Sequence, residues 1–328
     1  MPAIDLSIVV PCYNEEESLG ELHRRLSLVC RHFVEAGNKT YEIILVNDGS
    51  KDQTWQRMLD LAALDPHLVL VNLSRNHGHQ LTLTAGLSVC AGQLTLIMDA
   101  DLQDPPELLE QMVGIIQSGA DVVYGRRRRR VGESTFKRWT AALFYRVIQR
   151  LSDTPIPREA GDFRLMTRRA LDVLQAMPER HRFLRGMVSW IGFRQEPLDY
   201  DRDLRFAGTT KYPFSKMLRL AIDAVTAFSI KPLALASFVG LVTAALALLL
   251  LIYSLISWIA HRTISGWTSL MAGIALLSSV QLFVLGIIGE YLGRLYEQSK
   301  GRPLFIIERI VRSSESPATP APPSESHI

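Results

Sequence analysis

The chain has 328 residues, of which 48% are hydrophobic, and a formal net charge of +3 at pH 7. This length accommodates one large domain with additional elements, and so small an excess of positive charge does not indicate nucleic-acid binding. The three cysteines, Cys12, Cys30 and Cys90, lack the spacing of metal ligands. We therefore expect them to be packing residues in a reducing compartment.

Short apolar stretches alternate with amphipathic stretches over the first 124 residues. Strands are expected at residues 6–11, 41–47, 68–73, 94–99 and 120–124, and helices at residues 18–33, 54–64, 80–90 and 106–117. Alternation of this kind predicts an α/β domain with a mostly parallel sheet of the nucleotide-binding type.

Two carboxylates, Asp99 and Asp101, stand at the end of the strand expected over residues 94–99. Ligands of open α/β sheets bind at the carboxyl ends of the strands. Side chains at positions i and i+2 of an extended segment point the same way, so both acids could address one divalent cation together with diphosphate oxygens. An Asp-x-Asp triplet also occurs in ordinary surface loops, and alone it is weak evidence.

Polar loops follow the first two expected strands, at residues 12–16 and 47–52. Both loops would open at the same sheet edge as Asp99. Asp48 could accept hydrogen bonds from a base or ribose, and Tyr13 could pack against the base. The segment Asn-Asp-Gly-Ser (47–50) is also a good turn, and the two interpretations are compatible.

An unbroken run of arginines occupies residues 126–130, and a segment of basic and aromatic residues follows over about 134–151. The spacing predicts an amphipathic helix that lies on an anionic membrane surface. We expect a second interfacial helix at about 213–231. For the arginine run itself, a cluster of solvated charges is an equally acceptable interpretation.

Residues 233–257 and 268–289 contain no charged residue, and each segment is long enough to cross a bilayer. A buried hairpin of a soluble protein is disfavoured, because such helices rarely stay uncharged for so long. Trp258 and Trp267 flank the connector, as aromatic residues do at a membrane interface.

The charges that flank these segments predict the orientation. Basic residues lie on their outer sides, at Lys211, Lys216, Arg219, Lys231, Arg294, Lys300, Arg302, Arg309 and Arg312, whereas the connector has Arg262 and His261. By the positive-inside rule we expect a cytoplasmic domain over residues 1–232, a membrane hairpin over 233–292 and a cytoplasmic tail over 293–328. The tail is rich in Ser, Pro and Glu after about residue 313, and we expect it to be disordered there.

Glu290 lies at the cytoplasmic end of the second apolar segment. We expect it to pair with Arg294, four residues later. The alternative is a contact with a neighbouring subunit.

The chain resembles glycosyltransferase family 2, and within it the polyprenyl-phosphate glycosyltransferases, which include dolichol-phosphate mannose synthases and bactoprenol glucosyltransferases. The matching motifs are Val-Val-Pro-Cys-Tyr-Asn-Glu-Glu (9–16), Val-Asn-Asp-Gly-Ser (46–50), Ser-Arg-Asn-His-Gly-His-Gln (74–80), Asp-Ala-Asp-Leu-Gln-Asp-Pro-Pro (99–106), Gly-Asp-Phe-Arg-Leu (161–165), Ala-Gly-Thr-Thr-Lys-Tyr (207–212) and Gly-Glu-Tyr-Leu-Gly-Arg (289–294). The resemblance extends from about residue 6 to residue 310, and the order of the motifs makes it specific.

The resemblance implies a GT-A fold, an inverting mechanism and a requirement for Mg²⁺ or Mn²⁺. It assigns nucleotide-sugar binding to Pro11, Tyr13, Glu15, Asp48, Gly78, Gln80 and Asp99; metal binding to Asp99, Asp101 and Gln103; catalysis to Asp101 and Asp162; and lipid-phosphate binding to Arg126, Arg128, Arg138, Arg205 and Lys211. The arginine run leaves the register at residues 126–130 open.

Asp162 matches the aspartate often called the catalytic base of that family. A lipid phosphate, however, has its second pKa near 6, so it is already largely dianionic near pH 7 and needs no strong base. Asp162 could instead orient a cation or position the acceptor.

These expectations combine into transfer of a hexose, from UDP-glucose, to undecaprenyl phosphate at the bacterial inner membrane by a multi-pass homo-oligomer. The lipid-linked sugar would serve cell-surface glycan modification such as that of lipopolysaccharide or O-antigen. A processive polysaccharide synthase is disfavoured by the absence of a Gln-x-x-Arg-Trp motif. A non-catalytic membrane scaffold or flippase partner is disfavoured because Asp99, Asp101 and Asp162 are all present.

Overall fold

The computed structural model describes residues 4–37, 39–127, 160–180, 182–201, 231–259 and 266–312. The chain divides into two compact units. The first comprises Met1–Arg138, Ile156–Tyr212 and Pro303–Ile328, and the second comprises Trp139–Pro155 and Pro213–Arg302. The interfacial helix expected at 134–151, nearly all of the one expected at 213–231, and the tail after residue 312 lie outside the described residues.

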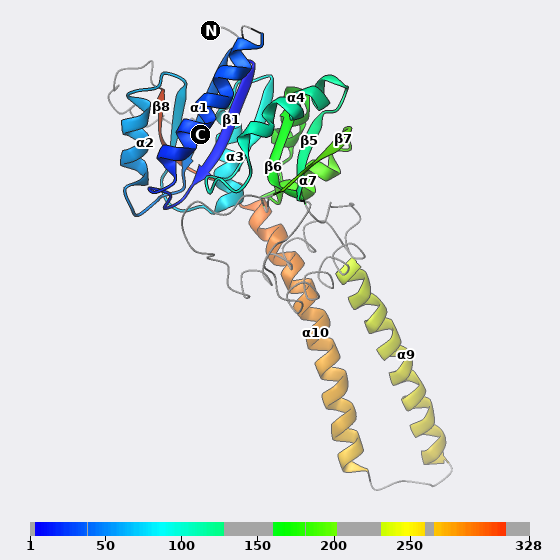
Figure 1. The fold of residues 1–328 in the computed structure, drawn as a ribbon. Helices are drawn as coiled ribbons and strands as arrows, with labels where there is room; N and C mark the ends of the chain where they lie inside the picture. The colour runs from blue at the N-terminus through cyan, green and yellow to red at the C-terminus, as the bar shows by residue number, and fades with distance from the viewer. Residues whose placement is uncertain are drawn as a thin grey trace, which may run out of the picture. The chain divides into compact units, whose positions relative to one another are not determined.

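One mixed sheet forms the centre of the first unit (Figure 1). Its described strands are β1 (Leu6–Cys12), β2 (Tyr41–Asn47), β3 (Leu68–Leu73), β4 (Leu94–Ile97), β5 (Val122–Arg127), β6 (Ala160–Thr167), β7 (Gln195–Tyr200) and β8 (Ile307–Arg312). Their order is β7-β5-β6-β4-β1-β2-β3-β8. The central strands β4, β1, β2 and β3 are parallel, whereas β6 runs antiparallel to β4 and β5, and β8 runs antiparallel to β3. The sheet is therefore mostly parallel, as the sequence predicts.

Helices cover both faces of this sheet. They are α1 (Leu19–Glu35), α2 (Thr54–Ala62), α3 (His79–Val89), the 3₁₀ turn η1 (Pro106–Leu108), α4 (Leu109–Gln117), α6 (Arg168–Ala176) and α7 (Leu184–Trp190). Alternate side chains of β1 point to opposite faces: Ile8 belongs to the core that includes Leu22 of α1, and Val9 faces α3. A Cβ at Gly86 of α3 would lie 2.4 Å from Val9 Cγ1, so this glycine lets the helix pack close to the sheet.

Two strand ends differ from the sequence prediction. β4 ends at Ile97, two residues before Asp99, because its pairing with β1 and β6 stops there and the chain then turns. β5 continues to Arg127 instead of ending at residue 124, because β7 pairs with it over its whole length. The first two arginines of the run therefore belong to a strand.

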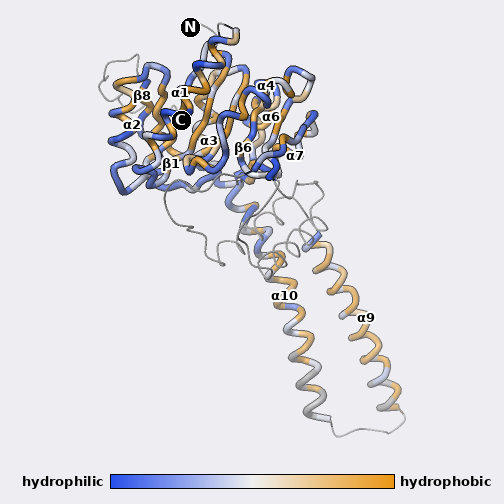
Figure 2. The backbone as a smooth tube through the Cα atoms, viewed as in Figure 1, coloured by the Kyte–Doolittle hydropathy of each residue, from blue (hydrophilic) through white to orange (hydrophobic). Residues whose placement is uncertain are grey.

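The second unit contains two long helices, α9 (Lys231–Ile259) and α10 (Trp267–Ser299). Figure 2 shows hydrophobic residues along most of α9 and in the middle of α10, whose C-terminal end is hydrophilic. Among the described residues, Lys231–Leu250 and Leu276–Ser299 are long and apolar enough to cross a membrane, and almost none of their residues are buried. Glu290 pairs with Arg294 at 2.8 Å, which confirms the predicted pairing.

The three cysteines are packing residues, as predicted, and the reducing compartment stays a prediction. Cys12, Cys30 and Cys90 are free and buried. Burial raises the pKa of each thiol, that of Cys30 to about 12, which suits packing residues without reactivity.

Candidate active site

The polar loops that follow β1 and β2 are joined to each other at the carboxyl ends of the strands. The backbone amide of Asn14 donates to Ser50 Oγ at 3.0 Å, and Asn14 Oδ1 accepts from the amide of Lys51 at 2.9 Å. Asn14 adopts a left-handed conformation with φ 55°, which asparagine tolerates better than most residues. The two loops consequently form one connected rim.

The predicted donor residues take different places on this rim. Tyr13 is exposed and can meet a flat ligand, whereas Pro11 is buried within β1. The carboxylate of Glu15 accepts from Ser18 Oγ at 2.9 Å, at the start of α1.

Asp48 organises the next loop. Its side chain is buried, and its two oxygens accept from the backbone amides of His77 at 2.7 Å and Gly78 at 3.0 Å. Gly49 has φ +63°, and a Cβ there would lie 2.7 Å from the backbone of Arg75, so a glycine is required. The turn interpretation of residues 47–50 is confirmed, and a contact between Asp48 and a nucleoside stays a prediction.

Asp99 and Asp101 lie on the turn that follows β4. Because β4 ends at Ile97, alternation along a strand does not place the two side chains on one face, and both acids follow the strand end on this turn instead. Both are partly exposed. Asp101 Oδ1 accepts from the backbone amide of Gln103 at 3.2 Å, so the third predicted metal residue belongs to the same turn.

Asp162 lies in β6, buried beneath this turn, and is surrounded by donors. Arg185 of α7 donates through Nε to Oδ1 at 2.8 Å and through Nη2 to Oδ2 at 3.1 Å. His79 Nε2 lies 3.0 Å from Oδ2, and Gln80 Nε2 donates to the same oxygen at 3.4 Å. Gln80 Oε1 also accepts from the amide of Leu184 at 2.9 Å, which fixes the start of α7.

Sequence reasoning missed His79 and Arg185. His79 lies in a motif that carries the family resemblance, but nothing in its spacing indicates a partner. Arg185 has no motif around it and reaches Asp162 only through the fold. His79 Nε2 also lies 3.6 Å from Asp99 Oδ1, so it stands between the two predicted functional acids.

The charges in this cluster shift several pKa values. Burial raises the pKa of Asp99 to about 6, although the charge of His79 opposes the rise. Burial would raise the pKa of Asp162 as well, but the charge and hydrogen bonds of Arg185, with the hydrogen bond from His79, hold it well below its usual range. Burial would lower the pKa of His79, and its bond to Asp162 outweighs that effect and raises it. The partners of Asp162 therefore favour its anionic form, whereas burial disfavours the anionic form of Asp99.

The donor set fits a hard divalent cation. In the part of the chain that the structure describes, no group of three or more His, Cys, Asp or Glu is arranged to hold a metal. Mg²⁺ commonly takes one or two carboxylates and completes its shell with water and substrate phosphates. Asp99 and Asp101 are two carboxylates of this kind on one turn, and their binding of a metal stays a prediction.

Of the arginine run at residues 126–130, the structure describes the first two residues. Arg126 forms a two-point ion pair, at 2.5 and 2.8 Å, with Asp199, its register partner in β7. Arg127 instead donates to Tyr200 Oη at 3.2 Å and to Asp104 Oδ1 at 3.4 Å, beside the Asp99 turn. Four predicted lipid-phosphate residues, Arg128, Arg138, Arg205 and Lys211, lie outside the described residues.

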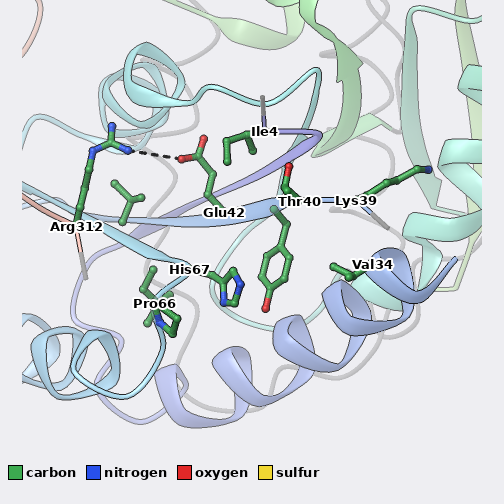
Figure 3. Close-up of a pocket in the computed structure, with 11 residues that line it drawn as sticks. Ile4, Val34, Lys39, Thr40, Glu42, Pro66, His67 and Arg312 are labelled. Carbon is green, nitrogen blue, oxygen red and sulfur yellow. Dashed lines mark ion pairs between the residues drawn. The ribbon is translucent and has the colours of Figure 1, made fainter. Parts of the chain in front are cut away.

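A cavity of about 340 Å³ lies at the other end of the strands (Figure 3). It is lined by the first residues of β2 and β3 and by Arg312, which faces Glu42 at 3.9 Å. Because ligands of such sheets bind at the carboxyl ends of the strands, this cavity is not part of the candidate active site.

The sheet, with acids at the carboxyl end of β4, defines a GT-A type α/β domain. The Glycosyl transferase family 2 profile matches residues 7–174, and the GtrB C-terminal hairpin profile matches residues 231–295. The chain belongs to glycosyltransferase family 2, and it is a glycosyltransferase that carries a GtrB-type hairpin.

Relatives match along nearly the whole chain. The "Uncharacterized glycosyltransferase YkcC" of Bacillus subtilis (strain 168) is 43% identical over 93% of this chain and 94% of its own. The "Prophage bactoprenol glucosyl transferase homolog" of Escherichia coli (strain K12) is 36% identical over 93% of this chain and 99% of its own. The "Bactoprenol glucosyl transferase" of Shigella phage SfV is 36% identical over 92% of this chain and 98% of its own.

Proposed function

We propose that this protein transfers glucose from UDP-glucose to undecaprenyl phosphate, with inversion and with the help of Mg²⁺ or Mn²⁺. The observation that carries the proposal is the pairing of Asp162 with Arg185 and His79 beside the Asp99 turn. The relatives named bactoprenol glucosyl transferase support the choice of sugar and of a polyprenyl acceptor.

The donor would lie along the rim of loops after β1, β2 and β4. Tyr13 would pack against the base, and the rim that Asp48 organises would hold the nucleoside. Asp99, Asp101 and Gln103 would hold the divalent cation. When bound, such a cation neutralises the negative charge that builds up on the leaving diphosphate.

In this proposal a phosphate oxygen of the acceptor attacks the anomeric carbon as the bond from that carbon to the diphosphate breaks. A single displacement of this kind inverts the configuration. The acceptor phosphate is already largely ionised near pH 7, so no side chain has to remove a proton. Arg185 and His79 hold Asp162 as an anion, so Asp162 is poorly suited to accept a proton. Its role is to position the side chains of Arg185 and His79.

An acceptor that resides in the membrane would explain why the chain carries an apolar hairpin. We infer that α9 and α10 cross the bacterial inner membrane, with the catalytic domain and both termini in the cytoplasm, since basic residues flank the hairpin on that side. The domain would then meet the lipid phosphate at the membrane surface. We also expect a homo-oligomer.

The experiment that tests the proposal uses membranes that contain the protein, undecaprenyl phosphate, Mn²⁺ and a panel of radiolabelled nucleotide sugars. UDP-glucose should yield labelled lipid, and membranes with the Asp101→Ala variant should yield none. Label from another nucleotide sugar alone would overturn the choice of donor. No labelled lipid from any donor, with folded protein present, would favour the non-catalytic scaffold.

A further inference from the structure

A buried polar cluster lies next to the Asp99 turn and takes no part in the chemistry proposed above. It consists of Asp104, Tyr200 and Arg127. Asp104 and Tyr200 are buried, and the Tyr200 hydroxyl donates to Asp104 Oδ1. Arg127 donates to both partners, at 3.2 Å to Tyr200 Oη and at 3.4 Å to Asp104 Oδ1. The three side chains are thus mutually bonded.

Two glycines make room for this cluster. A Cβ at Gly125 would lie 2.7 Å from the Tyr200 ring and 2.8 Å from the ring of Phe163. A Cβ at Gly161 would lie 2.9 Å from Arg127 Nη2. The ring of Tyr200 also packs edge-on against Phe163, with centroids 5.8 Å apart, so close packing restrains the ring whose hydroxyl bonds Asp104.

The cluster joins the turn that carries the predicted metal acids to two strands. Asp104 lies three residues after Asp101, on a segment in which Leu102 has φ +58°, a conformation that is unfavourable for leucine. Arg127 and Tyr200 are the last residues of β5 and β7, and they are register partners in the sheet. Loss of these partners would leave a desolvated charge on the buried carboxylate of Asp104, so the hydrogen bonds hold it strongly in place.

We propose that Tyr200 is a positioning residue that holds the segment from Asp99 to Asp104 in its folded conformation and so sets the geometry of the metal acids. The effect on metal use rests on the proposed function. The effect on the segment itself does not, and it can be measured without any substrate.

The test compares full-length wild type with Tyr200→Phe in detergent micelles. The matched control is Tyr41→Phe, since Tyr41 lies at the amino end of β2, away from the carboxyl ends of the strands, and its ring stacks on His67. Hydrogen exchange without substrate should be at least threefold faster for the amides of residues 101–104 in Tyr200→Phe. The Mn²⁺ concentration that gives half-maximal transfer should rise at least threefold in the same variant. Both quantities should stay at wild-type values in Tyr41→Phe.

Wild-type exchange in a folded Tyr200→Phe would overturn the inference, and so would faster exchange that leaves the Mn²⁺ requirement unchanged. If Tyr200→Phe does not fold, Asp104→Asn replaces it, because the amide keeps the shape and removes the charge that Arg127 and Tyr200 hold. Its exchange should rise in the same segment, and wild-type exchange there would equally overturn the inference. Failure of the wild type to transfer sugar with Mn²⁺ would instead count against the proposed function. The exchange experiment needs no transfer activity, so it tests the positioning role separately.

Discussion

Arg185 donates two hydrogen bonds to the carboxylate of Asp162, from a helix 23 residues further along the chain. A two-point guanidinium–carboxylate pair fixes both position and orientation. With His79 on the same carboxylate, the pair makes Asp162 a structural anion within the candidate active site.

Asp162→Asn should separate a positioning role from that of a general base. The acceptor phosphate is ionised above about pH 6.5, so the loss of rate should be the same factor from about pH 6.5 to pH 9. The measurement is the transfer rate of variant and wild type across that range. A defect that shrinks as hydroxide becomes available would return Asp162 to the role of base.

Arg185→Lys should keep the charge but lose the two-point pairing, and we expect the rate to fall at least tenfold. Arg194→Lys is the matched control, because Arg194 is exposed and pairs with Glu196 at 3.1 Å away from the cluster. Radiolabel transfer and thermal unfolding should be measured together. An unchanged rate in a folded Arg185→Lys would contradict the positioning role of this pair.

Removal of the metal or of its acids should abolish transfer. Asp101→Ala should be inactive and remain folded, and EDTA should silence the wild type, because the diphosphate would leave without charge neutralisation. Asp60→Ala, on the exposed side of α2, should keep its activity. Full wild-type activity in EDTA, with metal-free protein confirmed, would rule out the cation.

Replacement of Arg126, Arg128 and Arg138 by Gln should raise the apparent KM for undecaprenyl phosphate. Each basic residue near an anionic surface contributes on the order of 1 kcal/mol. Donor affinity, measured by calorimetry with UDP-glucose and Mn²⁺, should stay within about threefold, less than the 1.4 kcal/mol of a tenfold change. Unchanged acceptor kinetics would favour solvated charges, and an equal loss of donor binding would place these arginines at the diphosphate.

Asp65→Asn should lower stability in a pH-dependent way, far from the active site. Asp65 accepts from the His67 amide at 3.0 Å and lies 2.8 Å from His23 Nε2. Burial opposes the shift, but these hydrogen bonds lower the pKa of Asp65, so its contribution is present above about pH 4 and is lost as the pH falls through the lowered value. Thermal unfolding should show a cost of about 1 kcal/mol at pH 7 that shrinks below pH 4. A cost that does not change with pH would contradict this account.

Features that depend on neighbours along the chain can be predicted from the amino-acid sequence alone. The strand ranges 41–47 and 68–73 agree with β2 and β3, since apolar runs bounded by turns mark buried parallel strands. The pairing of Glu290 with Arg294 follows from helical spacing alone. The turn at residues 47–50 and the long apolar helices are likewise local properties.

The surroundings of Asp162 and the ends of two strands depend on contacts between segments that are distant along the chain. β4 stops at Ile97 because its neighbours stop pairing there, and β5 continues to Arg127 because β7 supplies a partner. His79 and Arg185 meet Asp162 from helices far from it in the chain. A buried carboxylate needs hydrogen-bonding or charged partners, and here they come from segments that only folding brings close. The spacing of residues along one strand or helix cannot predict such contacts.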